Sequence, residues 1–134
     1  MYQPDQHKHN LMSLLQSEHL MHIGEKPSQF TIMLVEPRLY RPFTDYLEQN
    51  FSPDIIIGYF NGNHSVLELK NSWGRERKAV RQITNGIKWL VEMYNVDPQV
   101  IVGKMVVRSD KTYDWKLTHQ NGVRCNSSIV TRTD

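Results

Sequence analysis

Apolar residues recur along the chain with two different periods, which separate helical from strand segments. A helix over residues 5–22 is predicted by the near-helical spacing of Leu11, Leu14, Leu15 and Met21. A second helix is predicted over residues 36–51, where Pro37 suits the first turn and Pro42 kinks or restarts the helix. The strongest helical pattern covers residues 75–94, with an apolar stripe made of Val80, Ile83, Ile87, Leu90, Val91 and Tyr94.

Strands are predicted where apolar, partly β-branched residues run together between turn residues. Residues 52–70, SPDIIIGYFNGNHSVLELK, predict a hairpin whose turn is Asn61-Gly62-Asn63. Residues 100–107 predict a buried strand, and weaker patterns cover 111–119 and 123–131. Residues 30–35, FTIMLV, fit either a short strand or the buried lead-in to the next helix.

Composition narrows the class of protein without identifying it. The chain has 134 residues, 39% of them hydrophobic and 22% charged, which is ordinary for one globular domain with a real core. No apolar run approaches the roughly 20 residues needed to cross a bilayer. The polar start of the chain lacks the apolar region of a signal peptide, and a single cysteine, Cys125, excludes an internal disulfide. We therefore expect a cytoplasmic protein with no membrane partner.

The predicted hairpin places three charged residues where polar filler or apolar core would be expected. With the three-residue turn, paired residues have numbers that sum to 124, so Asp54 lies opposite Lys70 and Ile56 opposite Glu68. Because side chains two apart on a strand share a face, Asp54, Glu68 and Lys70 project from one face. Leu67 and Leu69 then point into the core. A two-residue turn would break this register unless a bulge restored it.

Two carboxylates that lie close together stay ionised only if a cation sits between them. Lys70 supplies one positive charge, and a divalent ion such as Mg²⁺ or Mn²⁺ suits the hard oxygen ligands of Asp54 and Glu68. The lysine can orient or help deprotonate an attacking water, or stabilise charge on phosphorus. The group therefore indicates phosphodiester hydrolysis. The alternative is a cross-strand ion pair on a solvated sheet face, against which the Ile and Leu runs on both strands argue.

At these residues the chain resembles the PD-(D/E)XK nuclease superfamily, which has the restriction endonuclease-like fold. The match consists of Pro53-Asp54, a spacer, and Glu68-Leu69-Lys70. The resemblance implies an α/β fold with a central mixed sheet flanked by helices, in the order helix, three strands, helix, strand. Residues 36–107 fit this order except for one strand of the three, unless residues 30–35 supply it in a different order. It also implies a Mg²⁺- or Mn²⁺-dependent deoxyribonuclease, with the metal held by Asp54, Glu68 and the Leu69 carbonyl.

Two further positions match patterns found in parts of the superfamily. Glu36 begins Glu36-Pro37-Arg38-Leu39-Tyr40-Arg41-Pro42, which resembles a segment whose glutamate contacts the metal or a water. Gln82 matches a glutamine in the helix that follows the (D/E)XK strand. For Glu36 the alternative is favourable charge at a helix N-terminus, and for Gln82 a solvent-facing position on the helix.

Basic residues gather directly after the candidate site, although the net charge of +2 says little by itself. Between residues 70 and 88 a single acid, Glu76, stands against Lys70, Arg75, Arg77, Lys78, Arg81 and Lys88. Beside an acidic metal site these residues indicate contact with the phosphate backbone, and the alternative is a solvated helix face. Trp73 is placed either to stack on a base or to pack. We expect the N-terminal histidines (His7, His9, His19 and His22) to be solvated, because no ligand pattern for zinc accompanies them.

The sequence thus predicts one nuclease-like domain over residues 1–134, with an N-terminal helix near 5–22 and a catalytic core near 30–110. The expected function is metal-dependent hydrolysis of DNA with low sequence specificity, because no separate DNA-reading domain is recognisable. A homodimer is plausible, since cutting both strands needs two such sites. The alternative is a catalytically inactive nuclease-like domain that binds nucleic acid or protein as a regulatory factor. The intact Asp54, Glu68 and Lys70 set argues against that alternative.

Overall fold

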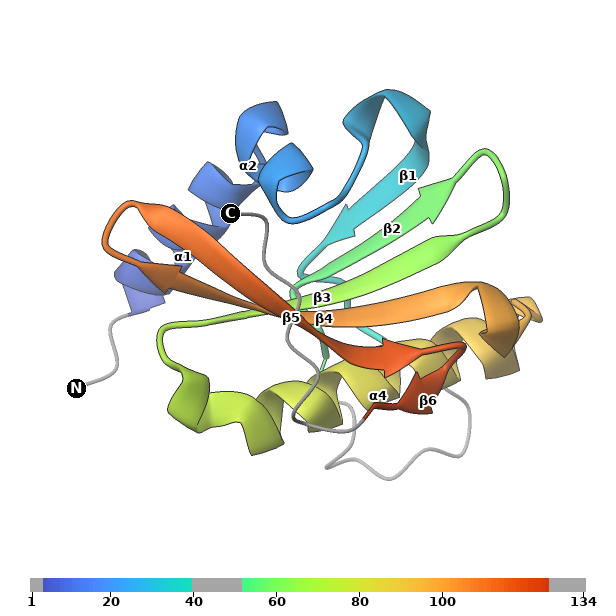
Figure 1. Cartoon of the computed structure of the whole chain (residues 1–134). Coiled ribbons are helices and arrows are strands. Elements are labelled where there is room, and N and C mark those ends of the chain that lie inside the picture. The colour runs from blue at the N-terminus through green and yellow to red at the C-terminus, as the bar shows by residue number, and fades with distance from the viewer. Residues whose placement is uncertain (1–3, 40–51, 126–134) are drawn as a thin grey trace.

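The computed structural model describes residues 4–39 and 52–125, which build a six-stranded mixed sheet in the order β1-β2-β3-β4-β5-β6 (Figure 1). All neighbouring strands are antiparallel except β3 and β4, which are parallel. The strands are β1 (Phe30–Val35), β2 (Ile55–Tyr59), β3 (His64–Lys70), β4 (Ile101–Ser109), β5 (Thr112–Gln120) and β6 (Val123–Arg124). The helices are α1 (Pro4–Leu14), α2 (Ser17–His22) and α4 (Glu76–Tyr94), with short 3₁₀ turns η1 (Pro27–Gln29), η2 (Trp73–Arg75) and η3 (Pro98–Val100).

Helices cover both faces of the sheet, with α1 and α2 on one side and α4 on the other (Figure 1). Alternation along β2 and β3 divides their apolar side chains between two cores. Ile55, Ile57, Leu67 and Leu69 pack with the buried residues of α1 and α2. Ile56 and Val66 instead pack against α4. The continuous apolar runs of the hairpin follow from this double cover, and the predicted α/β class is confirmed.

The N-terminal helix differs from its prediction, because it breaks into α1 and α2 at Leu15 and Gln16. Gln16 has extended backbone angles (φ −67°, ψ 140°), which no continuous helix contains. The break turns α2 so that Leu20 and Ile23 reach the same core as Leu11 and Leu14. Met21, expected on the buried stripe, is 58% exposed as a result.

Residues 30–35 form a strand, and the helix expected to begin at Glu36 is absent from residues 36–39. The remainder of that prediction, residues 40–51, lies outside the described residues, as does the predicted strand beyond Cys125. β1 pairs with β2, so the chain order from α1 to β4 is helices, three strands, helix, strand. Tyr94, predicted on the buried stripe of the long helix, is 63% exposed because it is the last residue of α4.

The hairpin of β2 and β3 has a register two residues away from the predicted one. Gly58 pairs with His64, so partner numbers sum to 122. The turn closes through a hydrogen bond of 2.9 Å from the Tyr59 amide to the Asn63 carbonyl, and Gly62 takes a positive φ of 90°. A shift by two keeps each side chain on its face, so Asp54 comes opposite Glu68 instead of Lys70.

Within the described residues, no helix is long and apolar enough to span a membrane.

Candidate active site

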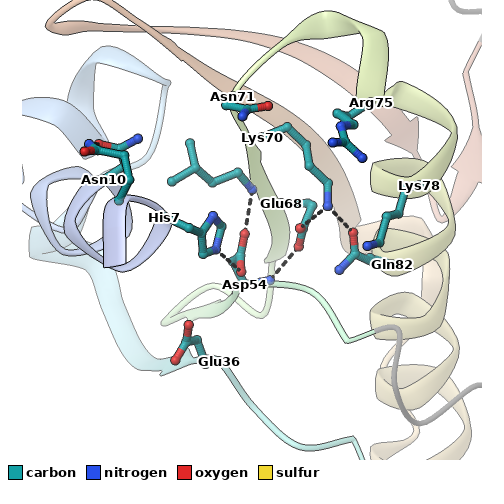
Figure 2. Close-up of a pocket in the computed structure, with 12 residues that line it drawn as sticks. His7, Asn10, Glu36, Asp54, Glu68, Lys70, Asn71, Arg75, Lys78 and Gln82 are labelled. Atoms are coloured by element: carbon teal, nitrogen blue, oxygen red, sulfur yellow. Dashed lines mark hydrogen bonds and ion pairs between the residues drawn. The ribbon is translucent and has the colours of Figure 1, made fainter. Parts of the chain in front are cut away.

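A polar cleft of about 790 Å³ opens at the end of the sheet where β2 begins and β3 ends. α1 forms one wall, and the segment from Asn71 into α4 forms the other (Figure 2). The cleft is lined by Gln6, His7, Asn10, Glu36, Asp54, Glu68, Leu69, Lys70, Asn71, Arg75, Lys78 and Gln82. The structure therefore brings Asp54, Glu68, Lys70, Gln82 and Glu36, all predicted from the sequence, to one cavity.

Asp54 is held from three directions at the entrance to β2. Its backbone N–H donates to Glu68 Oε1 at 2.9 Å, and its Oδ2 accepts the Leu69 N–H at 2.8 Å. Its Oδ1 lies 3.2 Å from Nε2 of His7 (Figure 2). Pro53, directly before it, packs on Gly86 of α4 so closely that an added Cβ at Gly86 would meet the proline ring at 2.8 Å. Backbone and packing therefore fix the Asp54 carboxylate in the cleft.

Glu68 is 1% exposed, which excludes the alternative of an ion pair on a solvated sheet face. Burial, and then the charge of Asp54, raises the pKa of its carboxyl well above the usual range. Lys70 opposes this effect, because its Nζ lies 3.0 Å from Glu68 Oε2. A second cation in the cleft would favour the ionised form of Glu68 further.

Lys70 is positioned by α4 as well as by its own strand. Its Nζ donates to Oε1 of Gln82 at 2.6 Å, and Nε2 of Gln82 donates to the Ser52 carbonyl at 3.2 Å. Gln82 is half-buried, so the alternative of a solvent-facing helix residue is wrong. Figure 2 shows the bond between Lys70 and Gln82. Through Ser52, the amide of Gln82 joins the lysine to the chain segment that carries Asp54.

Glu36 reaches the cleft from the end of β1 and not from a helix. Its backbone has a positive φ of 51°, and its N–H donates to the Asp54 carbonyl at 2.7 Å. The alternative, a favourable charge at a helix N-terminus, is wrong because residues 36–39 are not helical. One side-chain donor atom from each of His7, Glu36 and Asp54 lies within 4.8 Å of the others.

His7 is a titratable site residue that sequence reasoning missed, as it also missed the neutral cleft residues Gln6, Asn10 and Asn71. The expectation of a solvated histidine is wrong, because its side chain is 27% exposed and bonded to Asp54. That hydrogen bond is the main cause that raises the pKa of the His7 imidazole. The available signal was positional: His7 lies four and seven residues before Leu11 and Leu14 and so continues their buried stripe.

The basic residues after the site fall into two groups. Arg75 and Lys78 line the cleft itself, and Figure 2 shows both on the α4 side, beside Lys70 and Gln82. A smaller hollow of about 290 Å³ next to it is lined by Gly74, Arg75, Arg77, Lys78 and Arg81. Lys88 lines neither hollow.

Of the two roles considered for Trp73, stacking on a base or packing in the protein, the structure favours packing. Trp73 lies half-buried against Ala79, Met105 and Val107, and Nζ of Lys116 sits 5.3 Å from its ring centroid. It lines neither hollow. The Leu69 carbonyl stays a predicted metal ligand: Leu69 lines the cleft, and its N–H is the group that bonds Asp54.

Comparisons with models of known families, with curated proteins and with solved structures found no match. Asp54 and Glu68 present carboxylate oxygens in a largely dry position beside an ammonium, and cations line one wall. This arrangement suits a hard divalent cation and a phosphate-bearing substrate.

Proposed function

We propose that this protein is a Mg²⁺- or Mn²⁺-dependent nuclease that hydrolyses phosphodiester bonds of DNA. The observation that carries the proposal is the joint placement of Asp54, Glu68 and Lys70 at the end of one hairpin, facing a cleft with a basic wall. The order helices, three strands, helix, strand supports the same assignment, because the PD-(D/E)XK superfamily with its restriction endonuclease-like fold has that order.

The donor set fits a divalent metal ion. The carboxyl groups of Asp54 and Glu68 offer more lone pairs than their present hydrogen bonds occupy. Burial beside Asp54 raises the pKa of Glu68, and a bound cation would favour its ionised form. Asp54 and Glu68 would hold the ion together with the Leu69 carbonyl, and Glu36 stands at the rim of the same cleft. Bound there, the metal supplies charge neutralisation for the phosphate and a lower pKa for a coordinated water.

Lys70 is the residue placed to act on the attacking water. An ammonium has three N–H donors, and two of them meet Glu68 and Gln82. The remaining donor can point a water at phosphorus or stabilise charge on a phosphate oxygen. Gln82 is a positioning residue, because it holds Lys70 and is itself fixed on the Ser52 carbonyl.

Substrate binding falls to the exposed cations beside the site. Arg75 and Lys78 face the cleft, and Arg77 extends the charge into the neighbouring hollow. These side chains lie around one end of a helix and form no single row for a groove, so they fit phosphates and not base edges. We infer low sequence specificity, and a pair of chains for cutting both strands of a duplex.

The decisive experiment is a cleavage assay on linear duplex, single-stranded, branched and RNA substrates with Mg²⁺, Mn²⁺ or Ca²⁺. We expect DNA cleavage with Mg²⁺ or Mn²⁺, none with Ca²⁺, and none by Glu68→Gln in any metal. DNA binding without cleavage under every condition would instead indicate the inactive, regulatory domain.

A further inference from the structure

We propose that His7 is a metal ligand of this cleft and that its imidazole makes the site prefer Mn²⁺ to Mg²⁺. The inference rests on the proposed function for the location of the metal. It adds to the carboxylates of the hairpin a nitrogen donor from helix α1. It also names the ion that the complete donor set selects.

The distances around Asp54 are those of neighbouring ligands on one ion. Metal–ligand bonds of about 2.1 Å at right angles place adjacent ligand atoms about 3 Å apart. Nε2 of His7 lies 3.2 Å from Oδ1 of Asp54. Donor atoms of His7, Asp54 and Glu36 all lie within 4.8 Å of one another, so a small shift of Glu36 would complete three corners. Figure 2 shows the three side chains converging on the α1 side of the cleft.

The fold holds His7 at this place firmly. One turn further along α1, Leu11 is 1% exposed in the core. Beside it, the Asn10 carbonyl accepts a hydrogen bond of 2.7 Å from the hydroxyl of Tyr113, and Nη1 of Arg108 donates to Asn10 Oδ1 at 3.1 Å. These contacts tie α1 to β4 and β5. His7 is therefore presented to Asp54 by a docked helix and not by a loose chain end.

A nitrogen donor changes which ion the site selects. Mg²⁺ takes oxygen ligands almost exclusively and gives up its waters reluctantly. Affinity for a site of mixed nitrogen and oxygen donors rises along the transition series, and carboxylates suit Mn²⁺ as well as they suit Mg²⁺. The set of His7, Asp54 and Glu36, whose donor atoms lie within 4.8 Å of one another, therefore matches Mn²⁺ better than Mg²⁺. If His7 served only as a counter-ion to Asp54, its removal would change the affinities for both ions alike.

The first test is pulsed electron paramagnetic resonance of Mn²⁺ bound to the wild-type chain. We expect nitrogen hyperfine coupling from a directly bound imidazole. His9→Ala is the matched control, because His9 is exposed on the same helix and should leave the coupling unchanged. In His7→Ala the coupling should disappear. A wild-type spectrum without nitrogen coupling would overturn the proposal and needs no variant to fold.

The second test is calorimetric titration with Mn²⁺ and with Mg²⁺. His7→Ala should lose at least about tenfold in Mn²⁺ affinity and much less in Mg²⁺ affinity, whereas His9→Ala should match the wild type. Equal losses for both ions, or none, would contradict the proposal. The two proposals fail separately. Nitrogen coupling without any cleavage would leave His7 a ligand and refute the nuclease, while Mg²⁺-supported cleavage without coupling would do the reverse.

Discussion

The backbone N–H of Asp54 donates a hydrogen bond of 2.9 Å to the carboxylate of Glu68, across the open end of the hairpin. This bond runs from the residue before β2 to a side chain of β3, so it places two acidic residues together. Asp54 is 8% exposed and Glu68 1%, so water screens neither charge well. The hairpin thus concentrates negative charge at the point where the proposed reaction needs a cation.

Glu68→Gln should stabilise the metal-free protein. The raised pKa of Glu68 means that the folded chain binds a proton more tightly than the unfolded chain, so stability is lost as pH rises above about 4.5. At neutral pH a glutamine removes that cost while keeping the bond from Asp54. We expect the Tm of the variant to exceed that of the wild type when thermal unfolding is measured in chelator.

The same variant should lose the stabilisation that Mn²⁺ gives the wild type, which reaches about 2.7 kcal/mol at a hundredfold excess over Kd. Glu18→Gln is the control, because the Glu18 side chain is 75% exposed and does not line the cleft. A Glu68→Gln protein that melts lower than the wild type in chelator would contradict the prediction.

Lys70→Ala should remove the chemical step and spare binding. The ammonium contacts the groups at the reacting centre, Glu68 and Gln82, so its loss should lower kcat by at least about a hundredfold. DNA affinity in Ca²⁺ should fall only modestly. Single-turnover cleavage and binding titrations separate the two effects. Lys88 is an exposed lysine on α4, so Lys88→Ala should cleave as the wild type does. Comparable losses of cleavage rate in both variants would show that only the total positive charge matters.

Arg75→Ala combined with Lys78→Ala should weaken binding equally for unrelated DNA sequences. Each lost phosphate contact lowers the slope of log K against log salt by about 0.7 to 0.9, so the slope should flatten by about one to two units. This slope is measured by binding titrations in Ca²⁺ at several salt concentrations, with duplex, single-stranded and junction DNA. Lys26→Ala with Lys88→Ala removes the same charge from exposed positions outside both hollows. Equal slopes for the two double variants would place the DNA path elsewhere.

Gly86→Ala should destabilise the fold, although alanine normally favours a helix by about 1 kcal/mol over glycine. The new methyl group would meet Pro53 and Val66 at 2.8 Å. Overpacking of this kind costs about 1–3 kcal/mol, measurable by urea unfolding. Because Pro53 precedes Asp54, metal affinity should fall as well. Gly74→Ala is the control, with its nearest neighbour at 3.6 Å, and a stabilised Gly86→Ala would show that the helix can shift freely.

His119 should make stability depend on pH in the acid range. It is 2% exposed, and burial lowers the pKa of its imidazole to about 4. Thr84 donates its own proton to the Val80 carbonyl, so Nε2 of His119 donates to Thr84, and Nδ1 accepts from Thr118. The folded chain thus keeps the ring neutral while the unfolded chain protonates near pH 6.5.

Stability should therefore fall as pH drops from about 6.5 to 4, by up to about 3 kcal/mol. His119→Asn should be less stable at pH 7 but show a flatter dependence over that interval. Chemical unfolding at half-unit pH steps measures both slopes. An unchanged slope in the variant would assign the acid dependence to other groups.

The sequence by itself determined the local elements and the shared face of the candidate site. Hairpin, long helix and buried strand follow from periodicity, which depends only on neighbouring residues. Asp54, Glu68 and Lys70 were correctly placed on one face even though the register was two residues off, because alternation along a strand survives an even shift. Gln82 lies off the apolar stripe of the long helix, and that placement follows from the helical period alone.

The tertiary structure alone decided which segments meet. The register depends on how the turn closes between Tyr59 and Asn63, and the break at Gln16 depends on a core that Leu20 must reach. His7 entered the site because α1 docks on the sheet 47 positions before Asp54 in the chain. Contacts of that separation are set by packing of whole elements, and no local period encodes them. The sequence pattern thus placed Asp54, Glu68 and Lys70 on one face. The packing of α1 on the sheet added His7 beside Asp54.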